Sequence, residues 1–122
     1  MGEIGWFPLY IVKIENNLSQ DTIYITCRFD GRTIEEAQPN HVNSTLIFAY
    51  KSSLLAFSKL KCTFEWPKDK IAHIEAFIDY RVWVKKHCGD RHCNWKAADD
   101  GIYLYNFKQN MYNKVTNWTK ID

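Results

Sequence analysis

The clearest sequence signal for the fold lies in CGDRHCNWKAADDGIYLY, residues 88–105. Apolar and polar residues alternate in Cys93–Ala97 and again from Ile102 to Phe107, and Asp99-Asp100-Gly101 separates the two runs. An Asp-Gly turn between two alternating runs is typical of a β-hairpin. The two cysteines of this segment, Cys88 and Cys93, predict that disulfides tie the hairpin to the rest of the chain.

The same alternation recurs upstream. It is most regular in LKCTFEW, Leu60–Trp66, where every second residue is apolar. The other runs predict strands at Tyr10–Ile14, Ile23–Cys27, Thr45–Tyr50 and His73–Tyr80, with an edge strand at Tyr112–Trp118. His73–Tyr80 also fits helical spacing, but its short link to the preceding strand favours a hairpin.

The remaining segments are predicted to be connections. Asp30–Ser44 is polar and contains Gly31 and Pro39, so we expect a long connection there, with at most a helical turn at Thr33–Gln38. Leu54–Phe57 is ambiguous between a strand and a loop. We expect a turn at Pro67–Lys70 and a basic loop at Arg81–Cys88.

Together these segments predict an all-β protein, an antiparallel β-sandwich of about seven to eight short strands stapled by two disulfides. The 122 residues fit a single domain, 1–122, and we expect Met1 to be an added residue before a mature chain. A hydrophobic content of 46% is enough to build a core. No run approaches the ~20 apolar residues that a membrane span needs.

Cysteines and glycosylation motifs indicate an extracellular protein. An even count of four cysteines in a small chain is typical of disulfide bonding. Asn-x-Ser/Thr sequons supply candidate glycan acceptors at Asn17, Asn43 and Asn117. Met1–Ile4 has neither the basic start nor the apolar core of a signal peptide, so we expect the mature form of a secreted glycoprotein.

The sequence does not decide how the cysteines pair, because four cysteines allow three pairings. Cys27 and Cys62 lie on the inward faces of their predicted strands. A Cys88–Cys93 bridge would close a very short loop, whereas bridges between a late and an early cysteine would each contribute ~4 kcal/mol in the chain-entropy model. On that ground we favour Cys27–Cys93 and Cys62–Cys88.

Metal binding and catalysis find little support. His87-Cys88 and His92-Cys93 form an HCxxxHC arrangement that is compatible with zinc, but the signs of secretion favour oxidised sulfurs and exposed histidines. No histidine lies in a known catalytic signature, and Asp99-Asp100 before a glycine fits a turn better than a pair of catalytic carboxylates. We therefore predict no enzyme activity, no catalytic residues and no cofactor.

The charge distribution singles out one segment. The net charge of +2 gives no indication of nucleic-acid binding, yet residues 81–96 hold five basic residues against one acidic residue. A charge run of this kind is commonly a solvated loop, and the alternative is a recognition surface for an acidic partner. Trp83 within it is either an exposed interface anchor or a plug under a disulfide.

Five motifs of the chain form a specific combination: Ile14–Leu18 (IENNL), Cys27 at a strand end, Leu60–Trp66, the Cys88-x4-Cys93-Asn94-Trp95 spacing, and Asp100–Tyr103 (DGIY). The combination resembles the plant self-incompatibility protein family, which includes the stigma S-determinants of poppy and their homologues. The resemblance runs from about Val12 to Tyr105. The family commonly has His-Cys followed by an Asp-Asp-Leu-Gly box, whereas this chain has Thr26-Cys27 followed by Phe29–Ile34.

The resemblance implies a small secreted β-sandwich with two disulfides and no catalytic site. In the stigma-determinant branch it implies an extracellular ligand for a receptor protein in the pollen plasma membrane, where a self match triggers calcium influx, arrest of pollen-tube growth and cell death. We expect a monomer that binds no nucleic acid and inserts into no membrane. The alternatives are a secreted carbohydrate- or cell-wall-binding module and another secreted signalling homologue on the same scaffold.

Two loops are the candidates for carrying recognition. The first is Asp79–His92 and the second is Pro67–Lys70. In the first loop a central aromatic residue would hold the receptor while surrounding charges tune the choice of partner. The residues predicted to contact the receptor are Asp79, Arg81, Trp83, Lys85, Lys86, Asp90 and Arg91.

Overall fold

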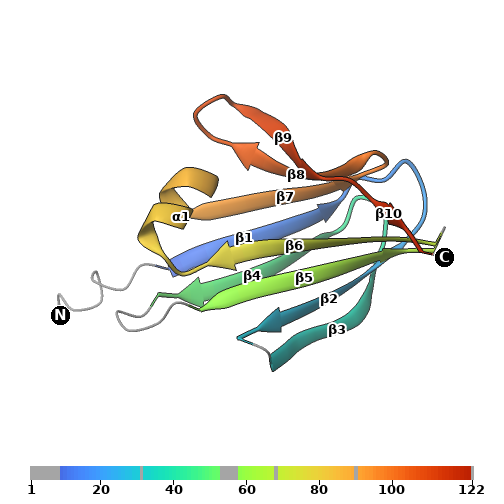
Figure 1. The fold of residues 1–122 in the computed structure, drawn as a ribbon, viewed down its shortest axis with the longest axis horizontal. Coiled ribbons are helices and arrows are strands. Elements are labelled where there is room, and N and C mark those ends of the chain that lie inside the picture. Colours follow the sequence, from blue (N-terminus) through green and yellow to red (C-terminus); the bar gives the residue numbers. More distant parts are fainter. Residues whose placement is uncertain (1–8, 31, 53–57, 68, 90, 122) are drawn as a thin grey trace.

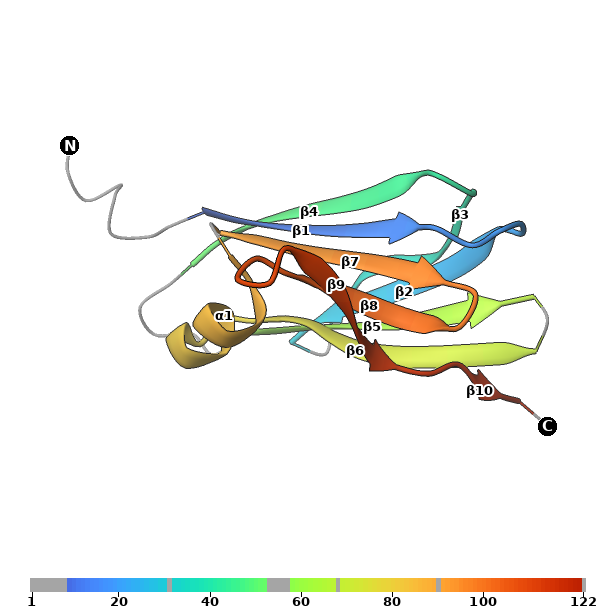
Figure 2. The same cartoon turned by 90° about the horizontal axis from the view of Figure 1, so that it is seen from above.

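Two five-stranded sheets pack against each other in the computed structural model of the chain, shown from two directions in Figures 1 and 2. The structure describes residues 9–30, 32–52, 58–67, 69–89 and 91–121. The all-β class predicted from the sequence is confirmed. The described elements are β1 Leu9–Asn16, β2 Ile23–Phe29, β3 Arg32–Asn40, β4 Thr45–Lys51, β5 Lys59–Trp66, β6 Lys70–Ile78, α1 Arg81–His87, β7 His92–Ala98, β8 Gly101–Asn106, β9 Met111–Thr116 and β10 Thr119–Lys120.

The sheets join strands that are far apart in the sequence. The first has the order β4-β1-β7-β8-β9, and the second has the order β10-β6-β5-β2-β3. Among the described strands, all pairs are antiparallel except β1 with β7, which run parallel with Ile11 opposite His92. The predicted antiparallel sandwich is therefore wrong at this one pair. No hairpin links β1 to β7, so the alternating pattern within each strand does not fix their relative direction.

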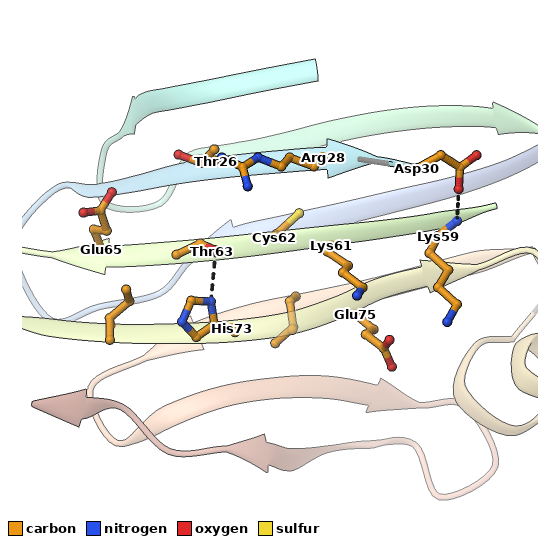
Figure 3. Close-up of a pocket in the computed structure, with 12 residues that line it drawn as sticks. Thr26, Arg28, Asp30, Lys59, Lys61, Cys62, Thr63, Glu65, His73 and Glu75 are labelled. Carbon is orange, nitrogen blue, oxygen red and sulfur yellow. Dashed lines mark hydrogen bonds between the residues drawn. The ribbon is translucent and has the colours of Figure 1, made fainter. Parts of the chain in front are cut away.

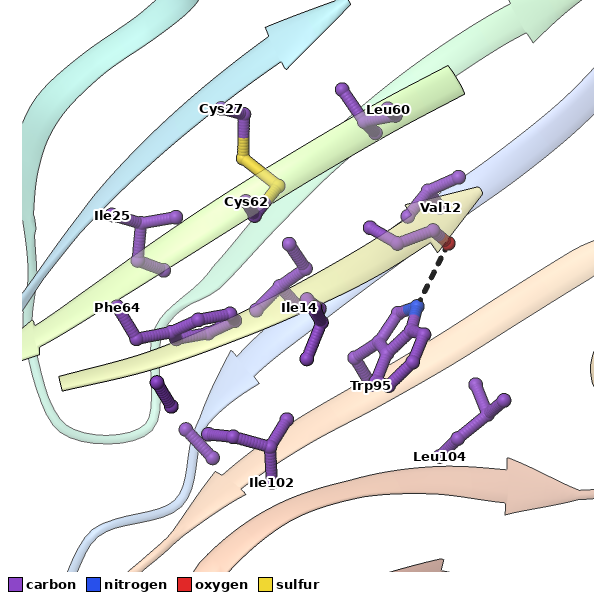
Figure 4. Packing of buried hydrophobic residues seen from close by; sticks show 14 of the residues in the cluster. Val12, Ile14, Ile25, Cys27, Leu60, Cys62, Phe64, Trp95, Ile102 and Leu104 are labelled. Atoms are coloured by element: carbon purple, nitrogen blue, oxygen red, sulfur yellow. Dashed lines mark hydrogen bonds between the residues drawn. A yellow bond between two sulfur atoms is a disulfide. The ribbon is translucent and has the colours of Figure 1, made fainter. Parts of the chain in front are cut away.

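The alternating pattern places the core. In β5, the four inward residues are at most 6% exposed, and Lys59, Lys61 and Glu65 on the other face are exposed. Successive side chains of a strand point to opposite faces, so one apolar face is buried against the other sheet. Figure 4 shows Phe64 of the second sheet in the same buried cluster as Ile14 and Ile102 of the first.

One buried polar group in this core is satisfied by the backbone. The indole Nε1 of Trp95 on β7 donates a hydrogen bond of 2.9 Å to the carbonyl oxygen of Ala76 on β6. The bond crosses from one sheet to the other. It satisfies a donor whose burial without a partner would destabilise the fold, and it helps to fix how the sheets sit on each other.

Most predicted strands are confirmed, some with longer bounds and others, such as β6, β8 and β9, with bounds shifted toward the N-terminus. β1, β2, β4, β5, β6, β7 and β8 all overlap the runs of alternating residues, and the C-terminal edge strand is β9. The structure contains ten strands rather than seven to eight among its described residues. Leu54–Phe57, which the sequence left ambiguous, lies outside the described residues.

The prediction of an irregular connection at Asp30–Ser44 is wrong. Arg32–Asn40 forms β3, which pairs with β2 at the edge of the second sheet, with register shifts next to Cys27. The segment pairs with β2 through its backbone, and its sequence has no regular alternation of apolar and polar residues that would have predicted a strand. Pro39 fits this position, because an edge strand tolerates the missing N–H of proline.

The favoured cysteine pairing is also wrong. The disulfides are Cys27–Cys62 and Cys88–Cys93, although the expectation that all four cysteines are oxidised is confirmed. Cys27 and Cys62 face each other on neighbouring strands β2 and β5 with their Cα atoms 4.1 Å apart, whereas Cys93 lies in the other sheet. The chain-entropy model estimates how much a given disulfide would stabilise the fold, but it does not say which cysteines are close enough to bond. That is decided by which strands are neighbours in the folded sheets.

Candidate functional site

A short helix occupies the segment that we predicted to be a basic loop. In α1, the N–H of Val84 donates to the carbonyl of Tyr80 at 3.0 Å, and that of Cys88 donates to the carbonyl of Val84 at 2.8 Å. Arg81–His87 spans only two turns, too few for helical periodicity to stand out in the sequence. Basic residues fill its last turn, where they interact favourably with the free carbonyl groups.

Aromatic packing fixes α1 against the sandwich. The Trp83 ring meets Phe77 of β6 edge to face at 6.1 Å and stacks on His87 at 4.5 Å between ring centroids. His87 Nδ1 lies 3.0 Å from the carbonyl oxygen of Trp83, so this nitrogen carries the proton and donates. Trp83 is half-buried and packs against the core, which is closer to a structural plug than to an exposed anchor.

The Cys88–Cys93 disulfide closes the link from α1 to β7. Inside it, Gly89 and His92 exchange two backbone hydrogen bonds of 3.1 and 2.8 Å. Phe107, in the turn between β8 and β9, lies so close that a Cβ on Gly89 would clash with its ring. We call this end of the sandwich the helix pole: α1, the Cys88–Cys93 disulfide and the turn Phe107–Asn110.

The helix pole brings together most of the predicted receptor-contact residues. Arg81, Lys85, Lys86 and Arg91 are exposed there. Trp83 lies beneath them, half-buried. Asp90 is outside the described residues. The exposed surface is therefore basic, with the apolar side chain of Val82 62% exposed among the charges.

Asp79 does not belong to this exposed surface, so its predicted role as a contact is not supported by its position. It is 9% exposed, and its carboxylate accepts hydrogen bonds of 2.9 Å from the Tyr50 hydroxyl and from Ser52 Oγ. Burial raises the pKa of Tyr50, and the hydrogen bond to Asp79 raises it further. Asp79 thus links the end of β4 to the end of β6 and has a structural role. Nothing in the sequence indicated this role, because Asp79 lay in a predicted recognition loop.

A groove that the sequence did not reveal separates α1 from the β8–β9 hairpin. Its volume is about 300 Å³. Figure 2 shows α1 beside the turn of the β8–β9 hairpin. Leu104 and the 52% exposed Val115 form an apolar part of the lining. Lys85 and Lys86 line it from the helix, and Lys108 lines it from the hairpin turn. Val115 is the extra residue at a register shift between β8 and β9, and such bulges leave no signal in the pattern.

A wider hollow lies on the outer face of the second sheet (Figure 3). It has a volume of about 930 Å³, and charges of both signs line it, including Arg28, Lys61 and Glu75. Thr63 Oγ1 lies 3.0 Å from His73 Nδ1, but the two residues are direct cross-strand neighbours on an exposed sheet. Three basic and three acidic residues are among its described lining residues, so its charge has no single sign that would favour an acidic or a basic ligand.

The outer face of the first sheet carries a cluster of half-buried tyrosines. The Tyr105 ring packs edge to face on Tyr112 and Phe107, with centroids 5.1 and 4.8 Å apart. Lys96 Nζ lies over the rings of Tyr112 and Tyr103, at 4.2 and 5.6 Å from their centroids. Neighbouring side chains therefore cover several ring faces that would otherwise stack on a sugar.

The three sequon asparagines gather at the other end of the sandwich, which we call the sequon pole. Asn17 donates its N–H to Ala97 at the end of β7, and Asn43 donates its N–H to Asn16, both at 2.8 Å. Asn117 precedes Trp118, whose indole donates to Ala98 at 2.7 Å. All three asparagine side chains are exposed.

The second predicted recognition loop also lies at the sequon pole. Pro67 of this loop follows Trp66, whose ring lies 5.3 Å from that of Trp118 next to the Asn117 sequon, and Lys68 lies outside the described residues. The carbonyl of Asp69 accepts a hydrogen bond from Ile121 at 2.7 Å. The two candidate loops therefore lie at opposite ends of the molecule and do not form one surface (Figure 1).

Two further features of the described residues bear on function. Within the described ranges, no three His, Cys, Asp or Glu side chains are grouped so that they could hold a metal ion. The sulfurs of the HCxxxHC arrangement are bonded to each other. In the part of the chain that the structure describes, no helix is long and apolar enough to cross a membrane.

Comparison with known protein families gives a match over most of the chain. The sequence model described as plant self-incompatibility protein S1 matches residues 11–118. The matched range reaches from β1 to Trp118 and includes both disulfides and both poles. No curated protein and no solved structure matches the chain significantly.

Proposed function

This chain belongs to the plant self-incompatibility protein S1 family, and we propose that it is a secreted stigma-side determinant that acts as a ligand for a receptor in the pollen plasma membrane. Recognition of self pollen by this ligand triggers calcium influx, which stops growth of the pollen tube and leads to cell death. The observation that carries the proposal is the family match across residues 11–118. The family is a signalling family rather than a known enzyme family, which agrees with a protein that acts by binding.

The helix pole supports the proposal as the receptor-binding surface. It exposes Arg81, Lys85, Lys86 and Arg91 on a segment held by a disulfide and by the packing of Trp83. A surface that is already ordered loses little conformational entropy on binding. Exposed charges at the rim of an interface mainly set the rate of association and the choice of partner.

The sequon pole supports the same orientation. Glycans on Asn17, Asn43 and Asn117 would shield that end of the sandwich and leave the helix pole accessible to a receptor. The two poles lie at opposite ends of the seven-residue strand β7, which corresponds to roughly 20 Å at the usual rise per residue. A ligand glycosylated in this way presents one free end to the pollen surface.

A test is to add the folded protein to pollen of known genotypes and to measure tube growth and cytosolic calcium. We expect inhibition of self pollen only. Exchange of residues 80–92 for those of a homologue with a different specificity, with Asp79 retained, should transfer the specificity to the donor genotype.

The matched control exchanges residues 67–69, at the sequon pole, between the same two proteins. We expect this variant to keep its original specificity. Transfer of specificity by the control, or unchanged specificity after exchange of 80–92, would contradict the placement of the receptor surface. Equal growth of all pollen in the presence of wild-type protein would contradict the proposed function itself.

A further inference from the structure

The groove beside α1 combines an apolar part of its lining with a basic rim. Leu104, 6% exposed, and Val115, 52% exposed, give an apolar part of the lining in a volume of about 300 Å³. This volume is at the lower end of the range for ligand sites and suits one or two side chains. An apolar surface that remains accessible in this way is stabilised when a partner covers it.

The rim of the groove is basic. Lys85 and Lys86 come from the last turn of α1, and Lys108 comes from the β8–β9 turn on the other side. All three side chains are exposed, and none of the described lining residues is acidic. The charge around the groove therefore has one sign, unlike that of the hollow on the second sheet.

Both walls are fixed before any ligand arrives. The Cys88–Cys93 disulfide ends the helical wall, and Phe107 lies directly on Gly89. Asn106 Oδ1 accepts hydrogen bonds from the N–H groups of Lys108 and Gln109, at 2.9 and 3.0 Å, which holds the turn in place. A ligand therefore meets a preformed site and does not have to order these loops.

From the apolar lining and the basic rim, we infer that the groove binds an acidic peptide segment of the partner protein that carries one apolar side chain. The apolar side chain lies against Leu104 and Val115, and carboxylates on either side of it meet Lys85, Lys86 and Lys108. The inference rests on the proposed function, since it takes the partner to be the receptor, and it adds the chemistry of the contact. It also adds the β8–β9 hairpin to a surface otherwise made by residues 80–92.

A peptide fits the groove better than an acidic sugar does. Binding of a sugar ring usually uses an open aromatic face, but Phe107 packs against Gly89 and meets Tyr105 edge to face at 4.8 Å. On the neighbouring outer face, Lys96 covers the rings of Tyr103 and Tyr112. Leu104 and Val115 give the groove an aliphatic part beside the half-buried rings of Tyr105 and Phe107, and this aliphatic part suits a leucine-like side chain.

The inference can be tested with three labelled peptides of nine residues and the full, disulfide-bonded protein. The first has a central leucine between aspartates and glutamates, the second carries asparagine and glutamine in their place, and the third replaces the leucine by serine. Fluorescence polarisation should show that the first peptide binds about tenfold more tightly than either of the others. Its binding should weaken as salt is added.

Two charge reversals locate the binding. Lys108→Glu should weaken binding of the acidic leucine peptide about tenfold. Lys120→Glu makes the same change in net charge on β10, at the sequon pole, and should leave binding unchanged. Both residues are exposed, so both variants should melt like the wild type. Equal binding of the three peptides, or equal loss in the two variants, would overturn the inference.

Two further outcomes separate this inference from the proposed function. Stronger competition by an oligosaccharide of uronic acids than by the peptide would overturn the choice of a peptide. Undiminished inhibition of self pollen by Lys108→Glu would overturn the role of the groove while the proposed function stands. If wild-type protein inhibits no pollen, the proposed function fails, and the peptide titration alone decides whether the groove binds an acidic segment.

Discussion

At the helix pole, a disulfide and a half-buried tryptophan hold an exposed basic surface in place, whereas at the sequon pole a buried asparagine holds the loops. Asn16 is fully buried, and its Nδ2 donates to the carbonyls of Asn40 and Asp21 at 2.7 and 3.2 Å. Its Oδ1 accepts from the N–H of Leu18 at 3.0 Å. The first pole is fixed by covalent and aromatic contacts close to its surface, and the second is fixed from inside.

The difference shows how one fold can keep the proposed recognition surface apart from the loops that carry the sequons. Residues that support the helix pole, such as Trp83 and Cys88, lie directly beneath the residues that would contact a partner. At the sequon pole, Asn16 supports loops whose predicted task is only to carry glycans. A change beneath the helix pole is therefore expected to affect recognition, and a change beneath the sequon pole is expected to affect stability.

The largest expected effect comes from removing the two disulfides separately. For Cys27→Ala/Cys62→Ala, whose cysteines are 35 residues apart in sequence, the chain-entropy model predicts that the free energy of unfolding falls by ~4 kcal/mol. For Cys88→Ala/Cys93→Ala, with a separation of 5 residues, it predicts a fall of ~2 kcal/mol. Urea denaturation measures both losses. We expect the second variant, although the more stable of the two, to lose more of its inhibition of self pollen while folded.

Each disulfide variant is the control for the other. If inhibition by the folded fraction falls in proportion to stability, so that Cys27→Ala/Cys62→Ala is the less active variant, the bridge at the helix pole has no particular role in recognition. That result would remove the distinction between the poles.

An intermediate effect is expected at the sequon pole from Asn16→Ala. The substitution leaves the carbonyl of Asn40 and the N–H of Leu18 without their buried partner, which should lower the free energy of unfolding by about 2–3 kcal/mol. Asn17→Ala is the matched control, since Asn17 is exposed and should change stability by less than ~0.5 kcal/mol. Urea titration of the unglycosylated protein measures both.

Asn16→Ala also tests whether the poles are independent. The folded variant should bind the acidic leucine peptide as tightly as the wild type does, because Asn16 is the last residue of β1 and that end of the strand lies away from α1 (Figure 1). Weaker binding by the folded variant would show that the two ends are coupled. Equal stability of the two alanine variants would contradict the structural role given to Asn16.

The alternation of apolar and polar side chains made the central strands predictable, but it gave no sign of the edge strand β3 or of the helix α1. Leu60–Trp66 has one buried and one exposed face, so its strand and its orientation follow from the sequence. β3 has backbone partners but no comparable pattern, and α1 is too short to show a period. The sequence therefore located the basic segment but not its helical conformation.

The pairing of residues far apart in the chain was the other source of error. Asp79 looks like a loop charge until the fold places Tyr50 and Ser52 around it. Cys27 and Cys62 become partners only because β2 and β5 are neighbours in the sheet. The groove forms between α1 and the β8–β9 hairpin, which are separate segments of the sequence. The sequence therefore did not indicate that Lys108 and Lys85 line the same groove.

The smallest expected effect is a pH-dependent one at the sequon pole. A hydrogen bond from the Tyr103 hydroxyl, 2.7 Å long, is the main cause that lowers the pKa of Asp100, and Lys114, 3.5 Å away, contributes to the same shift. Lys114 also donates to Asn117 Oδ1 at 3.1 Å, so this network reaches a sequon.

A carboxylate whose pKa is lower in the folded state stabilises the protein above its unfolded pKa of 3.8, and this contribution is lost as the pH falls through the folded pKa. Asp100→Asn should therefore melt slightly below the wild type at pH 7, and the difference should disappear as the pH falls through the folded pKa of Asp100. Asp69→Asn, at an exposed turn of the same pole, is the isosteric control and should match the wild type at pH 7. A difference for Asp100→Asn that stays constant from pH 7 to the acid limit would show that the substitution acts through turn geometry and not through the charge of Asp100.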